Sequence, residues 1–166
     1  MIISLIVAAS ENNAIGKNNQ LLWHLPKDMK FFKNTTWAMA VAMGRKTFES
    51  LNSKSLPGRK NIIITRQHGW NADGVSVVKS VDEAVALADE LDYKEIFIIG
   101  GGEIFMIAFD KAQKIYMTRV HADLEGDVFF PVIEKKDWKL VSSVDNPGDE
   151  KHPFAFTFEV WERKEI

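Results

Sequence analysis

The chain has 166 residues, 46% of them hydrophobic and 27% charged, which is the composition of one globular domain and excludes a disordered chain. The net charge of −2, with lysines and arginines scattered along the sequence, argues against nucleic-acid binding. The lack of cysteine excludes disulfides and thiolate chemistry, and the four histidines lack the spacing of metal ligands, so no metal site is expected.

The first predicted element is a strand over residues 2–9, where the sequence is almost continuously apolar. This run is too short to span a bilayer and has no basic leader. We therefore interpret it as a core strand and not as a signal peptide, and we expect a cytoplasmic protein.

A helix is predicted over residues 26–36, with Pro26 suited to its first position. At about 100° per residue the lysines share one side, and Asp28 falls on the other, between the directions of Phe31 and Phe32. A carboxylate there must pair, accept hydrogen bonds or shift its pKa upward, because burying it bare is costly. The alternative is a first-turn Asp that leans into solvent and complements the helix dipole.

The next predicted strand, over residues 39–43, leads into a turn and a helix expected over residues 45–52. The turn consists of Gly44, Arg45, Lys46 and Thr47. Cations are disfavoured by the dipole at a helix N-terminus, so their placement here favours an anionic ligand such as a phosphate. A plain surface role for the two cations is the alternative.

A proline-glycine turn, Leu56-Pro57-Gly58-Arg59, precedes a strand predicted over residues 61–65. Arg59 is either an ordinary turn residue or an arginine held rigidly enough to bind a carboxylate through two hydrogen bonds. The sequence spacing does not distinguish these alternatives. Arg66, directly after the strand, places another cation at a strand carboxyl end, where open α/β sheets bind their ligands.

Further strands are predicted over residues 75–78 and 96–99, and further helices over residues 82–91 and 103–109. Ser80 and Glu83 form the capping pattern of the first of these helices. Before the second come Gly100, Gly101 and Gly102, which let backbone N–H groups approach a ligand at a helix start. Such clusters also make tight turns without a ligand, and the spacing is not the dinucleotide fingerprint.

The last strands are predicted over residues 114–121, 138–144 and 154–162. In the final strand Phe154, Phe156, Phe158 and Val160 alternate onto one face, which is typical of an antiparallel pair at a sheet edge. We predict an α/β fold in one domain, with a mixed, mainly parallel sheet of about eight strands, antiparallel at the C-terminal edge, and about four flanking helices.

In this order the segments resemble the dihydrofolate reductases, of the bacterial chromosomal kind, over nearly the whole chain. The residues that carry the resemblance are Ala8-Ala9, Ile15-Gly16, Leu22-Trp23-His24-Leu25-Pro26-Lys27-Asp28, Met43-Gly44-Arg45-Lys46-Thr47, Leu56-Pro57-Gly58-Arg59, Ile99-Gly100-Gly101-Gly102, Thr118 and Glu125-Gly126-Asp127. The resemblance implies one domain over residues 1–166 that reduces 7,8-dihydrofolate to tetrahydrofolate with hydride from NADPH, in support of one-carbon metabolism. It also implies binding of antifolate inhibitors, and we expect a monomer.

The resemblance implies two catalytic residues. Asp28 would bind the amino-pyrimidine edge of the pterin and promote protonation of N5, and Trp23 would help to hold a water beside the pterin. Thr118 would support the same edge, and Arg59 would bind the α-carboxylate of the glutamate tail. Residues 10–24 would form a mobile loop over the nicotinamide. The remaining substrate-lining residues would be Ile6, Ala8, Met29, Phe32, Leu51 and Ile99.

The resemblance also implies the residues that bind NADPH. Arg45, Lys46, Thr47 and Arg66 would hold its phosphates, with Arg45 and Arg66 nearest the 2′-phosphate. The three glycines, Gly100, Gly101 and Gly102, would face the pyrophosphate. The other cofactor contacts would be Ala8, Ile15, Gly16, Gly44, Thr65, Lys79, Ile99, Glu103, Ile104 and Phe105.

The sequence departs from the usual family pattern at four positions. Leu22 stands where proline is usual, which predicts a more mobile loop, and Phe105 lacks the hydroxyl that is common there. Ala40 and Ala42 stand in place of a proline and a bulkier aliphatic residue, which predicts looser local packing. None of these changes removes a catalytic group.

Two other functions are considered. A pyrimidine reductase of the riboflavin pathway would share the fold and the cofactor, but its substrate has no glutamate tail for Arg59. A nucleotide-binding regulatory protein without catalysis would suit a solvent-facing Asp28, which the amphipathic pattern of the helix argues against.

Overall fold

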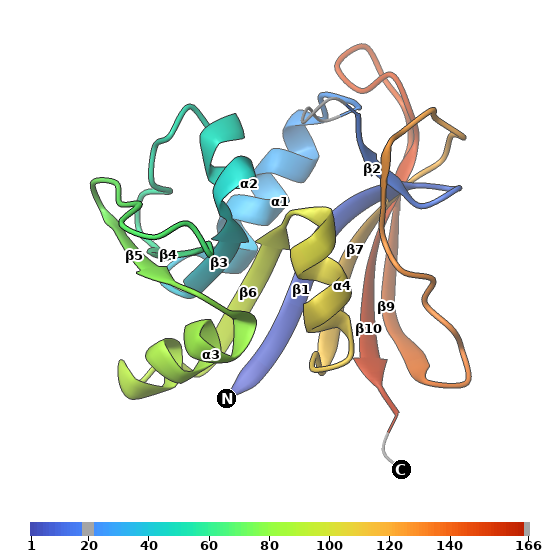
Figure 1. Cartoon of the computed structure of the whole chain (residues 1–166). Helices are drawn as coiled ribbons and strands as arrows, with labels where there is room; N and C mark the ends of the chain where they lie inside the picture. Colours follow the sequence, from blue (N-terminus) through green and yellow to red (C-terminus); the bar gives the residue numbers. More distant parts are fainter. Residues whose placement is uncertain (18–21, 165–166) are drawn as a thin grey trace.

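Eight strands form the central sheet of the computed structural model, which describes residues 1–17 and 22–164 (Figure 1). Their order across the sheet is β5-β4-β3-β6-β1-β7-β10-β9. The strands are β1 (Ile2–Ser10), β3 (Ala40–Gly44), β4 (Lys60–Ile64), β5 (Val75–Val78), β6 (Glu95–Gly100), β7 (Lys114–Val120), β9 (Trp138–Asn146) and β10 (Phe156–Arg163). Neighbours from β5 to β7 pair in parallel, and β10 pairs antiparallel with β7 and β9. The predicted fold class is confirmed.

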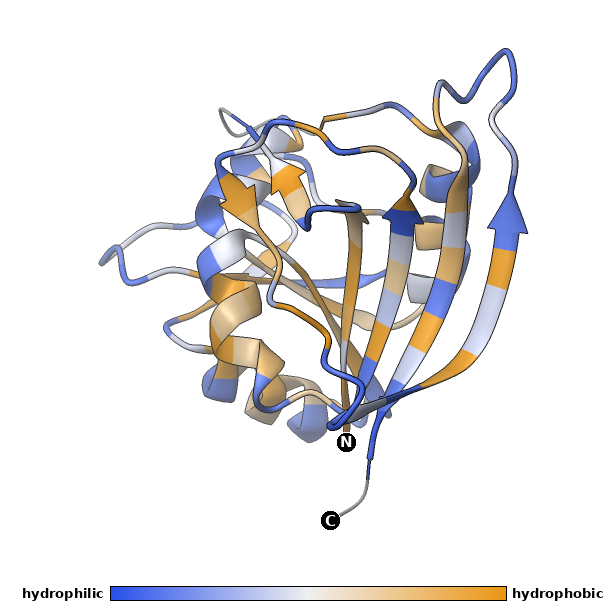
Figure 2. Cartoon of the chain, turned by 90° about the vertical axis from the view of Figure 1, so that its right-hand side faces the viewer, coloured by the Kyte–Doolittle hydropathy of each residue, from blue (hydrophilic) through white to orange (hydrophobic). Residues whose placement is uncertain are grey.

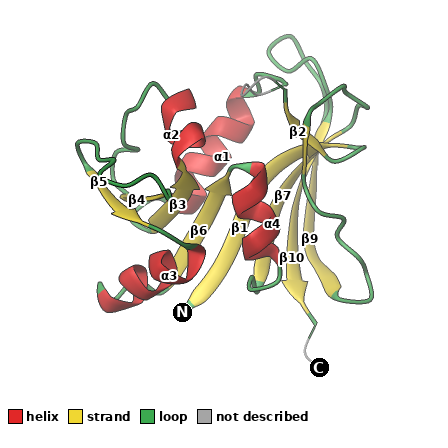
Figure 3. Ribbon diagram, viewed as in Figure 1, coloured by secondary structure: helices red, strands yellow, loops and turns green. Residues whose placement is uncertain are grey.

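Helices cover both faces of this sheet (Figure 3). Those in the described part of the chain are α1 (Pro26–Thr36), α2 (Arg45–Ser50), α3 (Val81–Glu90) and α4 (Gly102–Phe109). Phe48 of α2 lies in one apolar cluster with Ile63 of β4, and α1 joins this cluster. Ala84 of α3 lies in a second cluster with Ile62, and α4 joins it. Because consecutive strand residues point to opposite faces, α1 and α2 cover one side and α3 and α4 the other.

The parallel strands at the centre are buried on both faces, as their near-continuous apolar sequences predict. Ile96 and Ile98 of β6 are fully buried, and so are Ala40 and Ala42 of β3. Both alanines belong to the cluster under α3 and α4, so this departure from the family pattern lies in the core.

The antiparallel end of the sheet is more exposed. Hydrophobic and hydrophilic bands alternate along β9, which forms the sheet edge (Figure 2). Between Val160 and Trp161 of β10 the register with β9 skips Val141, so this bulge lies in β9. The pairing of β10 with β7 is continuous, and Trp161 is buried in the cluster under α3 and α4, on the opposite face from Val160. The predicted period of two therefore continues along the strand, which begins at Phe156 and not at residue 154.

A small second sheet was not among the predicted elements. It pairs β2 (Ala14–Gly16) with β8 (Val128–Phe129) in antiparallel fashion. The strands of three and two residues are too short to show a period, so their pairing depends on contacts between distant segments. A Cβ atom on Gly126 would lie 2.8 Å from Ala14 Cβ, so a bare backbone is needed there.

The parallel arrangement brings several strand ends to one edge of the sheet. β6, β3, β4 and β5 lie side by side, and the turns that follow them contain most of the predicted cofactor residues. This carboxyl edge is where ligands bind in open α/β sheets. No helix in the described residues combines the length and apolarity needed to cross a membrane.

Candidate active site

Asp28 lies in the first turn of α1 and faces β7. The Thr118 hydroxyl donates a hydrogen bond of 2.6 Å to Asp28 Oδ1, and Thr118 itself is buried. Burial raises the pKa of the Asp28 carboxyl above its ordinary value, and the hydrogen bond from Thr118 opposes this rise. Asp28 is therefore a paired, partly desolvated acid, and the interpretation as a solvent-facing first-turn Asp is wrong.

The start of α1 is held by a residue from the far end of the chain. Leu25, at the N-cap position, has no side-chain acceptor for the first N–H groups of the helix. The Lys27 N–H donates instead to His152 Nε2 at 3.1 Å, and Asp149 Oδ1 lies 2.8 Å from His152 Nδ1. This side-chain pair in the β9–β10 connection replaces a local cap. Sequence reasoning gave His152 no role, and the only signal was the missing capping residue at Leu25.

The apolar side of α1 is divided between core and solvent. Phe31 stacks on Phe158 of β10 with ring centroids 4.2 Å apart, and Phe32 packs against the cluster that contains Ile6. Met29 is 57% exposed, and its role as a substrate-lining residue stays a prediction.

The other predicted substrate residues lie on β1 and β6, after α2 and before α1. Ala8 of β1 is the register partner of Thr118 in β7, and both Ala8 and Ile99 of β6 are half-buried. Leu51, just after α2, is 36% exposed. Trp23 is half-buried and packs against the cluster of Leu25, Val120 and Phe156. The binding roles of these residues stay predictions.

The segment predicted as a mobile loop, residues 10–24, is anchored where it begins. Arg119 Nη1 donates to Ser10 O at 2.8 Å and to Asn13 Oδ1 at 2.7 Å. Lys17 Nζ then pairs with Glu125 Oε1 at 2.8 Å, and this contact lowers the pKa of the Glu125 carboxyl. Residues 18–21 of the predicted loop lie outside the described residues.

Arg59 is held by its surroundings. Its Nε donates to Pro57 O at 2.9 Å, and its Nη1 donates to Thr36 Oγ1 at 3.3 Å. Burial lowers the pKa of the Arg59 guanidinium. These contacts hold the guanidinium in place, and its binding to a carboxylate stays a prediction.

The two glycine-containing turns are in contact. Met43 is the register partner of Gly100, and a Cβ atom on Gly100 or Gly101 would lie 3.2 Å from Thr47 Oγ1. The φ of Gly100 is +150°, a conformation that side chains disfavour. The backbone of these turns and the Thr47 hydroxyl thus form one surface, which side chains would cover if other residues replaced the glycines. Such a surface fits a phosphate group at the start of α4.

The predicted cations follow the same edge of the sheet. Lys46, Arg66 and Lys79 are exposed after β3, β4 and β5. Arg45 Nη1 pairs with Glu49 Oε1 at 2.7 Å, four residues along α2. The sequence predicted that a negative charge compensates Arg45 at the start of the helix, and Glu49 supplies part of that charge. Phosphate binding by these cations stays a prediction.

The predicted cofactor residues of α4 differ in exposure. Glu103 is exposed and Ile104 is half-buried, whereas Phe105 is 3% exposed and packs edge-on against Phe130 with ring centroids 5.2 Å apart. Phe105 therefore acts mainly as a core residue here. The remaining predicted residues Ile15 and Gly16 lie in β2 and are half-buried, while Gly44 and Thr65 are half-buried at the ends of β3 and β4.

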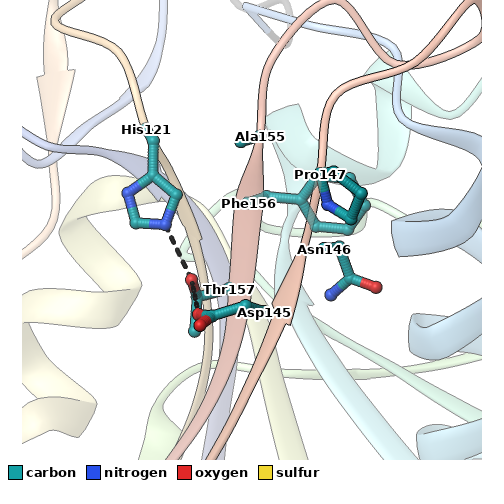
Figure 4. A pocket seen from close by; sticks show the side chains of 7 residues that line it. All are labelled: His121, Asp145, Asn146, Pro147, Ala155, Phe156 and Thr157. Carbon is teal, nitrogen blue, oxygen red and sulfur yellow. Dashed lines mark hydrogen bonds between the residues drawn. The ribbon is translucent and has the colours of Figure 1, made fainter.

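A hollow of about 480 Å³ lies elsewhere, between the ends of β7, β9 and β10. His121 Nε2 lies 2.7 Å from Thr157 Oγ1, which donates to Asp145 Oδ1 at 2.8 Å (Figure 4). Its lining residues are His121, Asp145, Asn146, Pro147, Ala155, Phe156 and Thr157. Among the described residues it includes none of those predicted for substrate or cofactor.

The raised pKa of Asp28 predicts a pH-dependent cost to stability. Between the ordinary value of 3.8 and the raised folded value, the folded protein binds more protons than the unfolded chain. Stability therefore falls as pH rises through this window and stays lower above it. Asp28→Asn should melt at a higher temperature than the wild type at pH 7 to 8, with the difference shrinking as pH falls toward 4.

Thermal melts across this pH range measure the effect. Asp73→Asn, which removes a carboxylate from an exposed position, is the control and should show no comparable gain. A wild type as stable as Asp28→Asn at every pH would contradict a desolvated carboxyl at residue 28.

Known proteins match the chain over almost its full length. The dihydrofolate reductase family profile matches residues 2–163. The chain is 42% identical over 158 residues to dihydrofolate reductase type 3 of Salmonella typhimurium, covering 95% of this chain and 96% of that one. It is 41% identical over 162 residues to dihydrofolate reductase of Bacillus subtilis, covering 98% and 95%.

A solved structure agrees with these sequence relatives. Dihydrofolate reductase from Enterococcus faecalis, complexed with NADP(H) and RAB-propyl, superposes with a TM-score of 0.90 at 37% identity, covering 99% of this chain and 97% of that one. The profile, the relatives and the fold lead to one conclusion. The chain belongs to the dihydrofolate reductase family.

Proposed function

We propose that this protein reduces 7,8-dihydrofolate to 5,6,7,8-tetrahydrofolate with NADPH. The observation that carries the proposal is the partly desolvated Asp28 carboxyl, which accepts a hydrogen bond from Thr118 of the central sheet. Membership of the dihydrofolate reductase family supports the same activity. The complex of the Enterococcus faecalis relative with NADP(H) supports the cofactor.

Asp28 serves the substrate in two ways. Its carboxylate accepts hydrogen bonds from the amino-pyrimidine edge of the pterin, and Thr118 fixes the orientation of that carboxylate through Oδ1. The raised pKa keeps a larger protonated fraction of Asp28 near neutral pH, as general acid catalysis requires. The proton reaches N5 either from Asp28 itself or through a water held beside Trp23.

The carboxyl edge of the sheet serves the cofactor. Thr47 and the backbone of Gly100, Gly101 and Gly102 receive the pyrophosphate, while Arg45 and Arg66 hold the 2′-phosphate. When bound there, NADPH supplies the hydride. The apolar strand residues at this end exclude water from the transfer.

An absorbance assay tests the activity. The purified protein should oxidise NADPH when dihydrofolate is added, and not when it is omitted or replaced by the pyrimidine substrate of the riboflavin pathway. No loss of NADPH absorbance with dihydrofolate would end the proposal.

Arg45→Ala should weaken binding of NADPH far more than binding of NADH. Charge-assisted bonds to a phosphate contribute roughly 1.5–3 kcal/mol, so the loss for NADPH should be about 10- to 150-fold. Fluorescence titration with both cofactors measures it. Lys54→Ala, which removes one positive charge from an exposed position after α2, is the matched control and should leave the preference intact. Equal losses for the two cofactors would show that Arg45 does not contact the 2′-phosphate.

We also propose that the enzyme works as a monomer in the cytoplasm. The exposed apolar residues of β9 are Leu140, Val141 and Val144. They lie on the edge strand of the sheet and do not form a long apolar stripe that a second copy of the chain would cover. Light scattering should give the mass of one chain, 18.8 kDa, and twice that mass would contradict the monomer.

A further inference from the structure

Trp37 is a large aromatic residue in an exposed position directly after α1. It is 49% exposed, and its six-membered ring lies against the backbone of Gly58. A Cβ atom on Gly58 would lie 2.3 Å from the Trp37 ring, so any other residue at position 58 would displace it. The Ala38 N–H also donates to Gly58 O at 2.9 Å. The end of α1 and the turn before β4 are thus fitted to each other.

The guanidinium of Arg59 is placed by this fit. Its Cζ lies 5.7 Å from the centroid of the Trp37 ring and 6.0 Å from that of Phe32, within the range of cation–π attraction. The Thr36 hydroxyl, which accepts from Arg59 Nη1, donates in turn to Phe32 O at 2.8 Å, and this bond fixes its direction. Among the described residues no hydrogen bond uses Arg59 Nη2, which leaves that group for a ligand.

We propose that Trp37 is a positioning residue that orients Arg59 for the carboxylate of the folate tail. An arginine side chain has large rotamer freedom, and fixing it before the ligand arrives reduces the entropy lost on binding. The ring also attracts a second cation, since Lys33 Nζ lies 5.5 Å from its centroid, which adds positive potential where a carboxylate binds. The inference rests on the proposed function, and it extends that function to a residue outside the predicted site.

Steady-state kinetics with two substrates test the inference. Trp37→Leu keeps an apolar side chain but removes the aromatic face, so the KM for dihydrofolate should rise about 3- to 30-fold with kcat unchanged. The KM for a 7,8-dihydropterin without the aminobenzoylglutamate tail should not change. Trp37→Phe should restore most of the lost affinity for dihydrofolate, because it restores an aromatic ring. A thermal melt of each variant confirms that it is folded.

A double-mutant cycle separates positioning from direct contact. If Trp37 acts through Arg59, Trp37→Leu should raise the KM for dihydrofolate much less in an Arg59→Ala background than in the wild type. Equal increases in both backgrounds, or an increase for the tail-less pterin, would overturn the inference.

The remaining outcomes distinguish this inference from the proposed function. A wild type without dihydrofolate reduction would end the proposed function itself. If Arg59→Ala raises the KM and Trp37→Leu does not, only the positioning role of Trp37 fails. If Arg59→Ala leaves the KM unchanged, the tail contact of Arg59 fails, and the inference fails with it.

Discussion

Asp28→Asn should lower turnover by roughly 100- to 10,000-fold at pH 7, the range that a positioned general acid contributes. Asparagine keeps an oxygen that can accept the hydrogen bond from Thr118, so the local structure should persist while the ionisable proton is lost. NADPH affinity should change little, because the cofactor residues lie at other strand ends. Single-turnover measurement of hydride transfer, together with a cofactor titration, gives both quantities.

The pH dependence gives an independent check on Asp28. In the wild type, kcat/KM should fall as pH rises through the raised pKa of Asp28, and this limb should be missing in Asp28→Asn. Thr118→Val retains the acid but removes the hydrogen bond that lowers its pKa, so the limb should move to higher pH. Unchanged turnover in Asp28→Asn would mean that the proton follows another route.

Arg59→Ala should raise the KM for dihydrofolate by roughly 30- to 1000-fold. The substitution leaves a carboxylate without its partner, which costs about 2–4 kcal/mol at a desolvated pair. The kcat should stay near the wild-type value, because Arg59 lies away from the acid: it contacts Pro57 and the end of α1, whereas Asp28 lies in the first turn of that helix. Initial-rate measurements over a range of dihydrofolate concentrations provide both constants.

The tail-less dihydropterin serves as the matched substrate for this variant. It lacks the carboxylate, so wild type and Arg59→Ala should reduce it with similar kcat/KM. Equal losses on both substrates would show that Arg59 supports the site as a whole and does not read the tail. Lys54→Ala, which removes one positive charge from an exposed position after α2, should leave the KM for dihydrofolate unchanged.

The features predicted best from the sequence depend on local periodicity. The bounds of α1 agree with residues 26–36, because Pro26 starts the helix and the lysines mark its exposed side. The same periodicity predicted that Asp28 lies on the apolar side of the helix, and there the Thr118 hydroxyl donates a hydrogen bond to it. The parallel core was predictable since its strands are apolar on both faces.

What escaped prediction depends on contacts between distant segments. The sequence did not show what surrounds Arg59, because Thr36 and Trp37 approach it only after α1 docks on the turn before β4. Trp37 had no recognised role for the same reason. The β2–β8 pair likewise depends on partners far along the chain, and the bulge in β9 depends on its pairing with β10. The roles assigned to single residues came from family resemblance and not from periodicity.

The bond between Lys27 and His152 has a consequence for the order in which the molecule is completed. These residues are 125 positions apart, so a ribosome must add 125 residues after Lys27 before the acceptor for its N–H exists. Until then the Lys27 N–H must donate its hydrogen bond to water, and the first turn of α1 is free to fray. The acid carried by that turn is secured only when the connection between β9 and β10 joins the fold, so nascent chains should acquire their ligand site only after that connection has been synthesised.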